Sequence, residues 1–344
     1  MSVDRVVLAA PRGFCAGVEK AIKALDWMTR VFDPPVYCYH EIVHNRHVVE
    51  HFARLGVVFV DDVADVPPGA PVMLSAHGSP PQVVAAARES GATVVDAVCP
   101  LVTKVHHETK VRASKGFTVL YVGHEGHEEA VGTMAVAPDS TVLIETLDDV
   151  DAVRGDGPFA LLSQTTLSLD EWQDLRERVE ARFPDVWTPQ RSDLCFATTN
   201  RQAALRAICA DADAVVVIGS ANSSNTVALT KVAEASGCPR VLRVNNADDL
   251  PDDLTGVVAV TAGASAPESL VDDVVARLAP AGGVEERRET TEDEYFPPPP
   301  ELREILRALS ALVDLALDVP VASSFDAGAD RVFTAAQVLT GAPS

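Results

Sequence analysis

The feature that most constrains the fold is a cysteine placed where a helix is predicted to begin, and this feature occurs three times. The largely apolar run 94–98 ends at Cys99, and Pro100 then occupies a position typical of the first residue of a helix. Cys15 precedes the helical pattern 16–30, and Cys195 precedes the helical pattern 196–210. Each cysteine opens a segment of comparable length, so the sequence predicts three units, each with one thiol at a helix N-terminus.

The position at a helix N-terminus predicts reactive thiols. The helix dipole is expected to lower the pKa of each thiol and to favour the thiolate, which is the form that binds metal. No cysteine pair has C-x-x-C spacing, which argues against a zinc ribbon or a thioredoxin-type pair. A site of three thiolates from distant segments stays open. The other cysteines, Cys38, Cys209 and Cys238, are predicted to be packing residues.

The order of strand-like and helix-like segments predicts an α/β fold with mostly parallel sheets. Apolar runs such as 5–10, 36–39 and 72–75 alternate with helical patterns such as 16–30 and 45–55, and the crossovers are short. We predict three similar α/β units at 1–98, 99–194 and 195–283. The remaining residues, 284–344, are predicted to form a linker, a helix over 302–316 and a tail. The charged run 285–294 is expected to be solvated.

Composition narrows the class of protein. The formal net charge is −22, which makes non-specific binding to nucleic acid or to anionic membranes unfavourable. No apolar run reaches the length of a membrane span, and residues 1–8 resemble a strand rather than a signal peptide. Six cysteines without the density of a disulfide scaffold favour a reducing cytoplasm.

Polar clusters follow several of the predicted strands. They contain small residues, hydroxyls and imidazoles, and loops at the carboxyl ends of parallel strands converge on ligands. Such loops at helix N-termini suit an anion such as phosphate. The sequence contains neither a G-x-G-x-x-G motif nor a Walker A motif, so neither a nicotinamide site nor a nucleoside triphosphate site is indicated. The clusters lie at 40–47, 75–79, 123–129, 164–166, 219–225 and 261–266.

Taken together, these segments resemble the 4-hydroxy-3-methylbut-2-enyl diphosphate reductase family, also called the LytB family. The resemblance runs from about Arg5 to about Leu302 and rests on many motifs in one order. They are Pro11-Arg-Gly-Phe-Cys-Ala-Gly-Val18, His44-Asn-Arg46, Ser75-Ala-His-Gly78, Cys99-Pro-Leu-Val-Thr-Lys-Val-His106, Gly132-Thr-Met134, Gln164-Thr-Thr-Leu-Ser168, Cys195-Phe-Ala-Thr-Thr-Asn-Arg-Gln202, Asn222-Ser-Ser-Asn225 and Thr261-Ala-Gly-Ala-Ser-Ala-Pro267.

The resemblance implies three α/β units around a central [4Fe–4S] cluster, one per chain, with three cysteine ligands and one open iron. It implies that Cys15, Cys99 and Cys195 are the metal ligands. Glu129 would be the proton donor, and Thr165 would hold the substrate hydroxyl and relay protons. The residues implied to bind the substrate diphosphate or to line its pocket are His44, His77, His127, Ser223, Ser224, Asn225 and Ser265.

The implied reaction is a two-electron reductive dehydroxylation, the last step of the non-mevalonate isoprenoid pathway. (E)-4-Hydroxy-3-methylbut-2-enyl diphosphate would lose its hydroxyl as water and give isopentenyl and dimethylallyl diphosphates. Because no flavin or nicotinamide motif is present, the electrons are expected from a protein of the ferredoxin or flavodoxin type. The chain departs from the family pattern at Glu128, where proline is usual, and at Thr226, where serine is usual.

Two other functions stay open from the residues alone. A hydrolase with zinc or non-haem iron would use His44, His77, His127 and Glu129 as ligands, independently of the cysteines. A non-catalytic phosphate-sensing module would use the hydroxyl-rich loops and keep the cysteines structural. Both require the three matched cysteine positions to be accidental.

Overall fold

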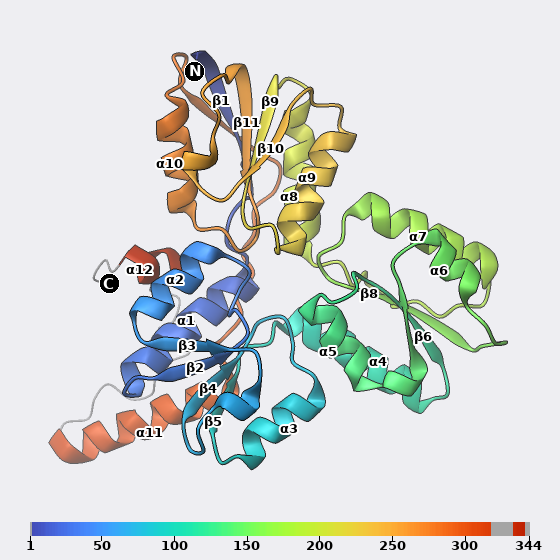
Figure 1. Ribbon diagram of the computed structural model, residues 1–344, viewed down its shortest axis with the longest axis vertical. Helices are drawn as coiled ribbons and strands as arrows, with labels where there is room; N and C mark the ends of the chain where they lie inside the picture. Colours follow the sequence, from blue (N-terminus) through green and yellow to red (C-terminus); the bar gives the residue numbers. More distant parts are fainter. Residues whose placement is uncertain (1, 318–332, 341–344) are drawn as a thin grey trace. The chain divides into compact units, whose positions relative to one another are not determined.

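The computed structural model describes residues 2–317 and 333–340, and within them the strands form three sheets (Figure 1). The strand orders are β10-β9-β11-β1-β12, β3-β2-β4-β5 and β7-β6-β8. Every pair of neighbouring strands is parallel. The predicted α/β class with parallel sheets is therefore confirmed.

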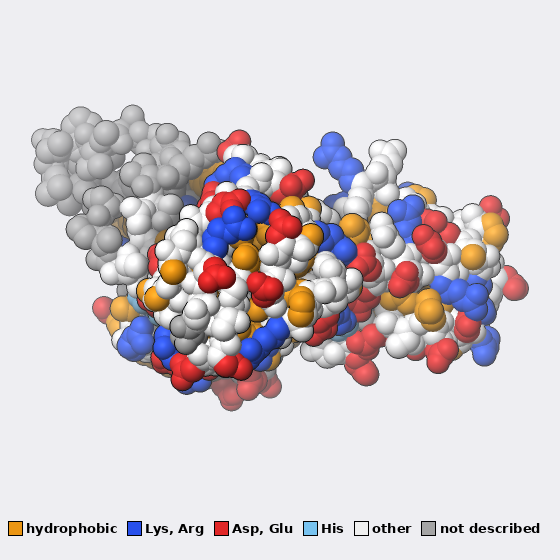
Figure 2. All heavy atoms as spheres, turned by 90° about the horizontal axis from the view of Figure 1, so that it is seen from above, with side chains coloured by type: hydrophobic (Ala, Val, Ile, Leu, Met, Phe, Trp, Pro, Cys, Tyr) orange, Lys and Arg blue, Asp and Glu red, His pale blue; other side chains and the backbone are white. Residues whose placement is uncertain are grey.

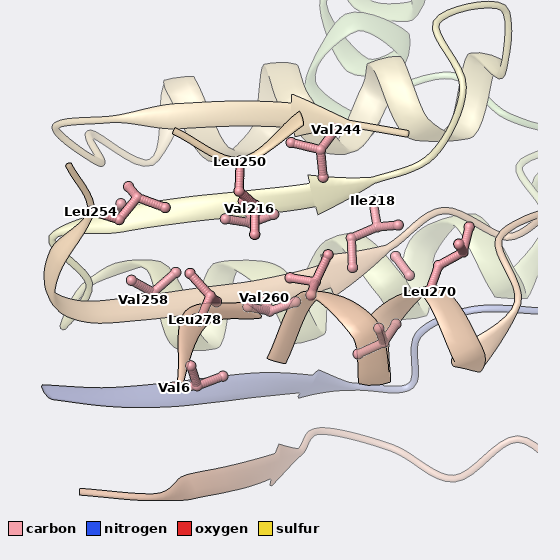
Figure 3. Close-up of a cluster of buried hydrophobic side chains, with 14 of the residues drawn as sticks. Val6, Val216, Ile218, Val244, Leu250, Leu254, Val258, Val260, Leu270 and Leu278 are labelled. Carbon is pink, nitrogen blue, oxygen red and sulfur yellow. The ribbon is translucent and has the colours of Figure 1, made fainter. Parts of the chain in front are cut away.

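The five-stranded sheet carries helices on both of its faces. Alternate residues of β9 (Ala214–Ile218) enter two separate cores, because successive side chains of a strand point to opposite faces. Val216 lies in the core that α10 (Glu268–Leu278) covers, and Val217 lies in the core covered by α8 (Phe196–Cys209) and α9 (Ser224–Ala235). Figure 3 shows the first of these cores, where each fully buried Val or Leu side chain contributes about 1.5–3 kcal/mol. The other strands are β1 (Ser2–Ala10), β10 (Val241–Val244), β11 (Thr255–Ala262) and β12 (Val284–Arg288).

The sheet partners of β1 correct two expectations. β1 pairs with β11 on one side and β12 on the other, so the strand predicted to open the first unit belongs to the sheet of the third. The start of the predicted 284–344 linker is itself a strand, β12. Local sequence patterns locate a strand, but its partners depend on contacts far away in the sequence, and sequential strands are neighbours in only about two-thirds of cases.

The four-stranded sheet contains the strands that precede the second thiol. β5 (Thr93–Asp96) ends three residues before Cys99, and α11 (Pro300–Leu317) contacts β5. Leu302 and Leu306 of α11 are buried, which supports docking of this predicted helix on its own chain. The other elements here are α1 (Ala16–Val31), β2 (Val36–Tyr39), α2 (Arg46–Arg54), β3 (Val57–Val60), β4 (Pro71–Leu74), α3 (Pro81–Glu89) and α12 (Ala335–Thr340).

The three-stranded sheet positions the predicted proton donor. Its strands are β6 (Thr118–Val122), β7 (Thr141–Ile144) and β8 (Phe159–Ser163). Tyr121 and Leu162 face a core that includes Ala130 of α5 (Glu128–Val136) and Val105 of α4 (Pro100–Ser114). The opposite face packs against Trp172 and Leu175 of α7 (Leu169–Arg182) and Val150 of α6 (Leu147–Ala152).

The described chain divides into two compact units. Residues up to Cys15 together with Leu101–Asp293 form one, called here the 101–293 unit. Ala16–Pro100 together with the described residues from Glu294 onward form the other, called here the 16–100 unit. The number of sheets equals the number of predicted α/β units, but β1 and β12 do not follow the predicted boundaries. The boundaries at 98, 194 and 283 otherwise stay a prediction.

The charged run 285–294 lies mostly on the surface, as predicted, but three of its glutamates form ion pairs with arginines. Glu285 pairs with Arg5, Glu286 pairs with Arg12, and Glu292 pairs with the fully buried Arg201. Acidic and basic side chains are interspersed on the face shown in Figure 2. Within the described residues, none of the helices combines the length and the apolarity that a membrane span requires.

Candidate functional site

Cys15 lies in a loop that is held against the carboxyl end of β11. The amides of Gly13 and Cys15 donate to the carbonyls of Ala262 and Ala264, each at 3.2 Å. Gly13 has φ +67°, and a Cβ there would lie 3.2 Å from the carbonyl oxygen of Ala266. Glycine is therefore required for this close approach, and it fixes the backbone two residues before the thiol.

Cys195 is the N-cap residue of α8. Its Sγ lies 3.2 Å from the amide of Thr198 and 3.0 Å from the Thr198 hydroxyl. Burial, with a smaller contribution from the nearby Cys15 thiol, nevertheless raises the pKa of the Cys195 thiol to about 11. The expectation of a lowered pKa is thus wrong for Cys195 without metal, because desolvation outweighs the helix terminus and its hydrogen bonds.

Cys99 belongs to the 16–100 unit and lies directly before α4. Its amide donates to the carbonyl of Ala76 at 3.0 Å, and the Asp96 carboxylate accepts from the amide of Val98 at 2.9 Å. The predicted position between a strand and a helix is confirmed for this cysteine. None of the six cysteines, which all lie in the described range 2–317, forms a disulfide. Cys38 and Cys209 are buried as predicted for packing residues, while Cys238 is partly exposed.

Glu129 and Thr165 form a buried pair in the 101–293 unit. The Glu129 carboxylate accepts from the Thr165 amide at 2.7 Å and from the Thr165 hydroxyl at 2.9 Å. The residue is 2% exposed, and burial raises the pKa of its carboxyl group to about 7, although both hydrogen bonds oppose the rise. A carboxyl group with this pKa exchanges its proton near neutral pH.

The serine and asparagine residues implied for diphosphate binding gather at the start of α9 and after β11. Asn225 accepts from the amide of Ala264 at 2.9 Å, so it ties α9 to the loop that holds Cys15. Ser265 Oγ lies 3.5 Å from Ser223 Oγ, and Ser223 caps α9 by accepting from the amide of Thr226. Hydroxyls and amides at a helix N-terminus suit a phosphate group.

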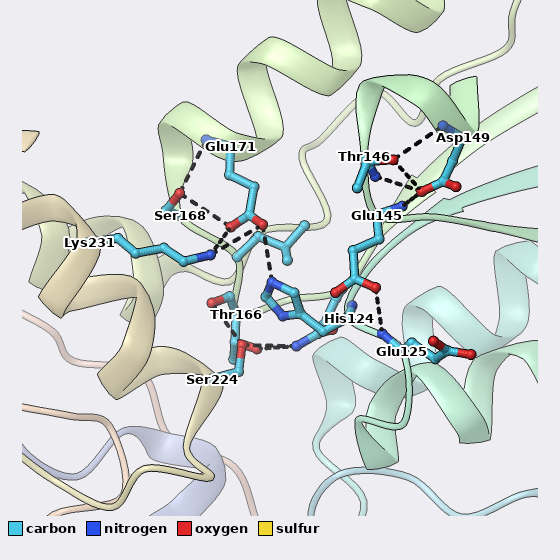
Figure 4. A network of polar contacts seen from close by, with 12 residues as sticks. His124, Glu125, Glu145, Thr146, Asp149, Thr166, Ser168, Glu171, Ser224 and Lys231 are labelled. Atoms are coloured by element: carbon cyan, nitrogen blue, oxygen red, sulfur yellow. Dashed lines mark hydrogen bonds and ion pairs between the residues drawn. The ribbon is translucent and has the colours of Figure 1, made fainter. Parts of the chain in front are cut away.

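Gln164 connects this cluster to the loop that leads to Glu129. Its side chain donates to Ser224 Oγ at 3.0 Å and to Thr166 Oγ1 at 2.9 Å, and it accepts from the amide of His124 at 3.1 Å. Figure 4 shows His124, Thr166 and Ser224 in this network. The sequence offered Gln164 only as the first residue of a Gln-Thr-Thr motif. Its role was missed because no local pattern reveals a contact sixty residues away.

The same network contains an ion-paired group. Glu171 of α7 lies 3.1 Å from His124 Nε2 and 3.4 Å from Lys231 Nζ of α9 (Figure 4). Desolvation has the largest single effect on the pKa of Glu171 and would raise it. The contacts with His124 and Lys231 together outweigh desolvation, so the pKa is lowered. The loop after β6 is therefore attached both to α7 and, through Gln164, to α9.

The predicted histidines occupy two settings. His127 caps α5, and its Nδ1 accepts from the amide of Glu129 at 3.2 Å, so the neutral ring carries its proton on Nε2. His44 and His77 lie in the 16–100 unit, where their rings stack with centroids 3.9 Å apart. His44 Nδ1 also lies 3.2 Å from Glu41 Oε2.

The predicted site residues therefore fall into two groups. The 101–293 unit brings together one set by the contacts above: Cys15, His127, Glu129, Thr165, Cys195, Ser223, Ser224, Asn225 and Ser265. The 16–100 unit holds His44, His77 and Cys99. Each group stands at strand ends or helix starts, as the polar loops predict.

Comparison with known proteins identifies the family. A family model described as LytB protein matches residues 6–279, which is well over half of the chain. The chain belongs to the LytB family. The match covers the whole of the segment that carries Cys15, Cys99, Cys195 and Glu129.

Relatives of this LytB chain have a consistent name. A 4-hydroxy-3-methylbut-2-enyl diphosphate reductase of Mycolicibacterium paratuberculosis is 48% identical over 283 residues, 81% of this chain and 85% of the relative. The solved structure of the E-1-hydroxy-2-methyl-but-2-enyl-4-diphosphate reductase from Plasmodium falciparum has a TM-score of 0.86 at 31% identity, covering 90% of this chain and 99% of that one. A structure of (E)-4-hydroxy-3-methyl-but-2-enyl diphosphate reductase, titled the terminal enzyme of the non-mevalonate pathway, has a TM-score of 0.59 at 26% identity, covering 80% and 99%.

Both departures from the LytB pattern are accommodated locally. Glu128 is the first residue of α5, where proline is usual and where a carboxylate also interacts favourably with the helix dipole. Thr226 faces two glycines, since a Cβ at Gly219 or Gly263 would lie 2.3 or 2.2 Å from Thr226 Oγ1. Both positions therefore require glycine.

Proposed function

We propose that this chain is a 4-hydroxy-3-methylbut-2-enyl diphosphate reductase. It converts (E)-4-hydroxy-3-methylbut-2-enyl diphosphate to isopentenyl and dimethylallyl diphosphates by reductive dehydroxylation, the last step of the non-mevalonate pathway. Family membership and the shared name of the relatives support this proposal.

The observation that carries the proposal is the position of Thr165. Its amide and hydroxyl hold the carboxyl group of Glu129, and its carbonyl accepts from the amide of Cys195 at 3.0 Å. A single residue thus joins a carboxyl group that exchanges protons near neutral pH to a thiol-bearing segment. Reductive loss of a hydroxyl group requires both a proton donor and an electron carrier, and this arrangement supplies candidates for both.

The thiols suit an iron–sulfur group. Cys15 and Cys195 both belong to the 101–293 unit and each directly precedes a helix, and the Cys15 thiol is close enough to influence the pKa of the Cys195 thiol. Thiolates are the ligands that such clusters take. We assign Cys15, Cys99 and Cys195 as the three ligands of one [4Fe–4S] cluster per chain. When bound, such a cluster would pass on, one at a time, the two electrons that the external donor supplies, and its iron without a cysteine ligand would act as a Lewis acid.

The protein's own groups bind the substrate and move protons. Ser223, Ser224, Asn225 and Ser265, together with His44, His77 and His127, bind the diphosphate and fix the position of the hydroxyl end. Thr165 orients that hydroxyl, and Glu129 donates the proton with which it leaves as water. Two electrons and two protons balance the reaction, since one proton joins the leaving hydroxyl and the other joins carbon.

The electron donor is proposed to be a protein of the ferredoxin or flavodoxin type. The substrate is a small allylic diphosphate, and neither nucleic acid nor a membrane is a proposed partner. A cytoplasmic location is proposed from the six cysteines, none of which forms a disulfide.

The alternative hydrolase has less support. It requires Glu129 as a metal ligand, but both carboxylate oxygens of Glu129 already accept hydrogen bonds from Thr165. A phosphate-sensing module would account for the hydroxyl loops, but it assigns no role to a buried carboxyl group whose pKa is raised to about 7.

The deciding experiment measures iron and acid-labile sulfide in protein prepared without oxygen. About four irons and four sulfides per chain are expected, with a change in the Mössbauer spectrum of one iron when the hydroxylated allylic diphosphate is added. A chemical reductant should then convert this substrate to the two isomeric products. Zinc in place of iron, or no metal after anaerobic reconstitution, would exclude the reductase.

A further inference from the structure

A cation follows each of the three proposed ligands at an interval of five or six residues. Lys20 lies five residues after Cys15, Lys104 five residues after Cys99, and Arg201 six residues after Cys195. Each therefore stands in the helix that its cysteine precedes, at α1, α4 and α8 respectively. None of these cations belongs to the residues assigned above to the reaction.

Arg201 binds the segment before Cys15. Its guanidinium donates to the carbonyl of Gly13 at 2.8 and 3.0 Å and to the carbonyl of Phe14 at 3.1 Å. The side chain is 1% exposed, and Glu292 supplies its counter-charge at 3.0 Å. A buried arginine with these partners holds the two residues that precede the thiol in one conformation.

Lys104 binds the segment before Cys195. Its ammonium donates to the carbonyls of Arg191 and Ser192 at 3.0 and 3.2 Å and to the Asp193 carboxylate at 2.9 Å. Asp193 is buried and also accepts from the amide of Ser163, at the end of β8. The lysine thus holds the turn before Cys195, and Asp193 attaches that turn to the end of β8, two residues before Thr165.

Lys20 binds the segment before Cys99. Its ammonium donates at 2.8 Å to the carbonyl of Val98, the residue that directly precedes the thiol. The residue is only 7% exposed. A lysine is rarely buried to this degree unless its ammonium has a defined partner.

We propose that Lys20, Lys104 and Arg201 are positioning residues for the three thiols and that they act in a cycle. The helix that follows Cys15 holds the segment before Cys99, the helix that follows Cys99 holds the segment before Cys195, and the helix that follows Cys195 holds the segment before Cys15. This inference rests on the proposed function only for the identity of the group that the thiols bind.

The physical consequence is specific to each cysteine. A loop that precedes a metal ligand must keep the thiol in place before the metal arrives, since ordering it at the moment of binding weakens affinity. Positive charge close to a thiolate cluster also favours its more negative, reduced state. Loss of one cation should therefore loosen one thiol. The loosened thiol should belong to the cysteine whose preceding segment the cation binds, and not to the cysteine that precedes the cation's own helix.

The test uses Lys20→Met, Lys104→Met and Arg201→Lys. Matched controls are Lys110→Met, an exposed lysine of α4, and Arg206→Lys, an exposed arginine of α8 that pairs with Asp170. Alkylation of each cysteine by iodoacetamide is followed by mass spectrometry in the reduced, metal-free, folded chain. Iron release to a chelator is followed in the anaerobically loaded protein.

Each variant should speed alkylation of a single thiol by about fivefold, the effect of losing one net hydrogen bond. Lys20→Met should affect Cys99, Lys104→Met should affect Cys195, and Arg201→Lys should affect Cys15. All three should release iron faster than the wild type, and both controls should match the wild type. The alkylation pattern needs no metal, so it decides the inference even if the wild type binds no iron and the proposed function fails.

Unchanged alkylation in folded variants, or an equal increase at all six cysteines, would overturn the inference. If Arg201→Lys does not fold, Glu292→Gln tests the same contact by removing only the counter-charge of Arg201. If that variant and both lysine variants also fail to fold, the cations serve stability alone and the inference is wrong.

Discussion

At the residue scale, Glu129 makes the stability of the metal-free chain depend on pH. Burial favours its neutral form, so the folded state keeps a proton that the unfolded state loses between 4.5 and about 7. The free energy of unfolding therefore falls as the pH rises through this window, by about 3 kcal/mol for this group. Glu129→Gln should remove this dependence, so its stability relative to the wild type should rise between pH 5 and pH 8.

Urea unfolding of both proteins across this pH range measures the difference. Glu180→Gln is a suitable control, because Glu180 lies on the surface of α7 and pairs with Arg176. If the free energies of unfolding of the wild type and Glu129→Gln differ by the same amount at all pH values, the carboxyl group of Glu129 does not titrate in this window.

The same substitution separates binding from chemistry. Glu129→Gln should keep the cluster and bind the diphosphate substrate, but it should lose most turnover because a glutamine cannot donate an acidic proton, a loss of about 10²-fold or more. Wild-type turnover should decline as the pH rises past about 7, where Glu129 loses its proton. Steady-state turnover and substrate titration of the loaded protein measure the two effects. Near-normal turnover would remove Glu129 from the proton path.

Gln164 offers a second prediction at this scale. Gln164→Leu removes the contacts to Ser224, Thr166 and His124, so the KM for the substrate should rise by about tenfold while cluster content is unchanged. Gln202→Leu is the matched control: Gln202 is also buried, and among the described residues its side chain bonds the backbone of Leu167 and Leu169. It should lower stability without this rise in KM. An equal KM effect in both variants would assign Gln164 to stability only.

At the element scale, the loop after β11 and the start of α9 fit together through Gly263. Gly263→Ala would place a Cβ 2.2 Å from Thr226 Oγ1, so the Thr226 side chain or the start of α9 around it, with Ser223 and Asn225, has to shift. We expect a loss of about 1–3 kcal/mol of stability and weaker diphosphate binding. Thr226→Ala in the same chain should restore both, because the nearest remaining Thr226 atom, its Cβ, is 3.3 Å away. Calorimetric titration with inorganic diphosphate tests the pair; a double variant no better than Gly263→Ala would refute this explanation.

The elements themselves were largely predictable because their signals are local. Helical periodicity and Pro100 locate the start of α4. The partners of β1 were not predictable, because its apolar residues suit any buried parallel sheet equally well. The side chains of β1 pack against α10 on one face of the sheet and against α8 on the other, and these distant contacts accompany its pairing with β11 and β12.

At the scale of the whole molecule, the chemistry of the site could be predicted more readily than its supports. Thiol, hydroxyl and imidazole side chains can be identified as site candidates from their residue type and from their positions after predicted strands. Arg201 and Lys20 resemble ordinary surface cations in sequence, because long charged side chains are usually exposed. Glu292 likewise belongs to an acidic run whose composition predicts exposure to solvent. Its ion pair with the buried Arg201 can be recognised only in the structure.

Substitution of Cys99 tests its proposed role as a metal ligand together with Cys15 and Cys195. Cys99 is the proposed ligand from the 16–100 unit, whereas Cys15 and Cys195 belong to the 101–293 unit. Cys99→Ser should therefore lose most iron and sulfide, and with them the rise in unfolding temperature that cluster loading gives the wild type. Cys238→Ser is the matched control, since Cys238 is also partly exposed but packs beside the core under α9. Metal analysis and thermal unfolding before and after anaerobic loading give the answer. Full iron content in Cys99→Ser would confine the metal to the 101–293 unit and remove Cys99 from its ligands.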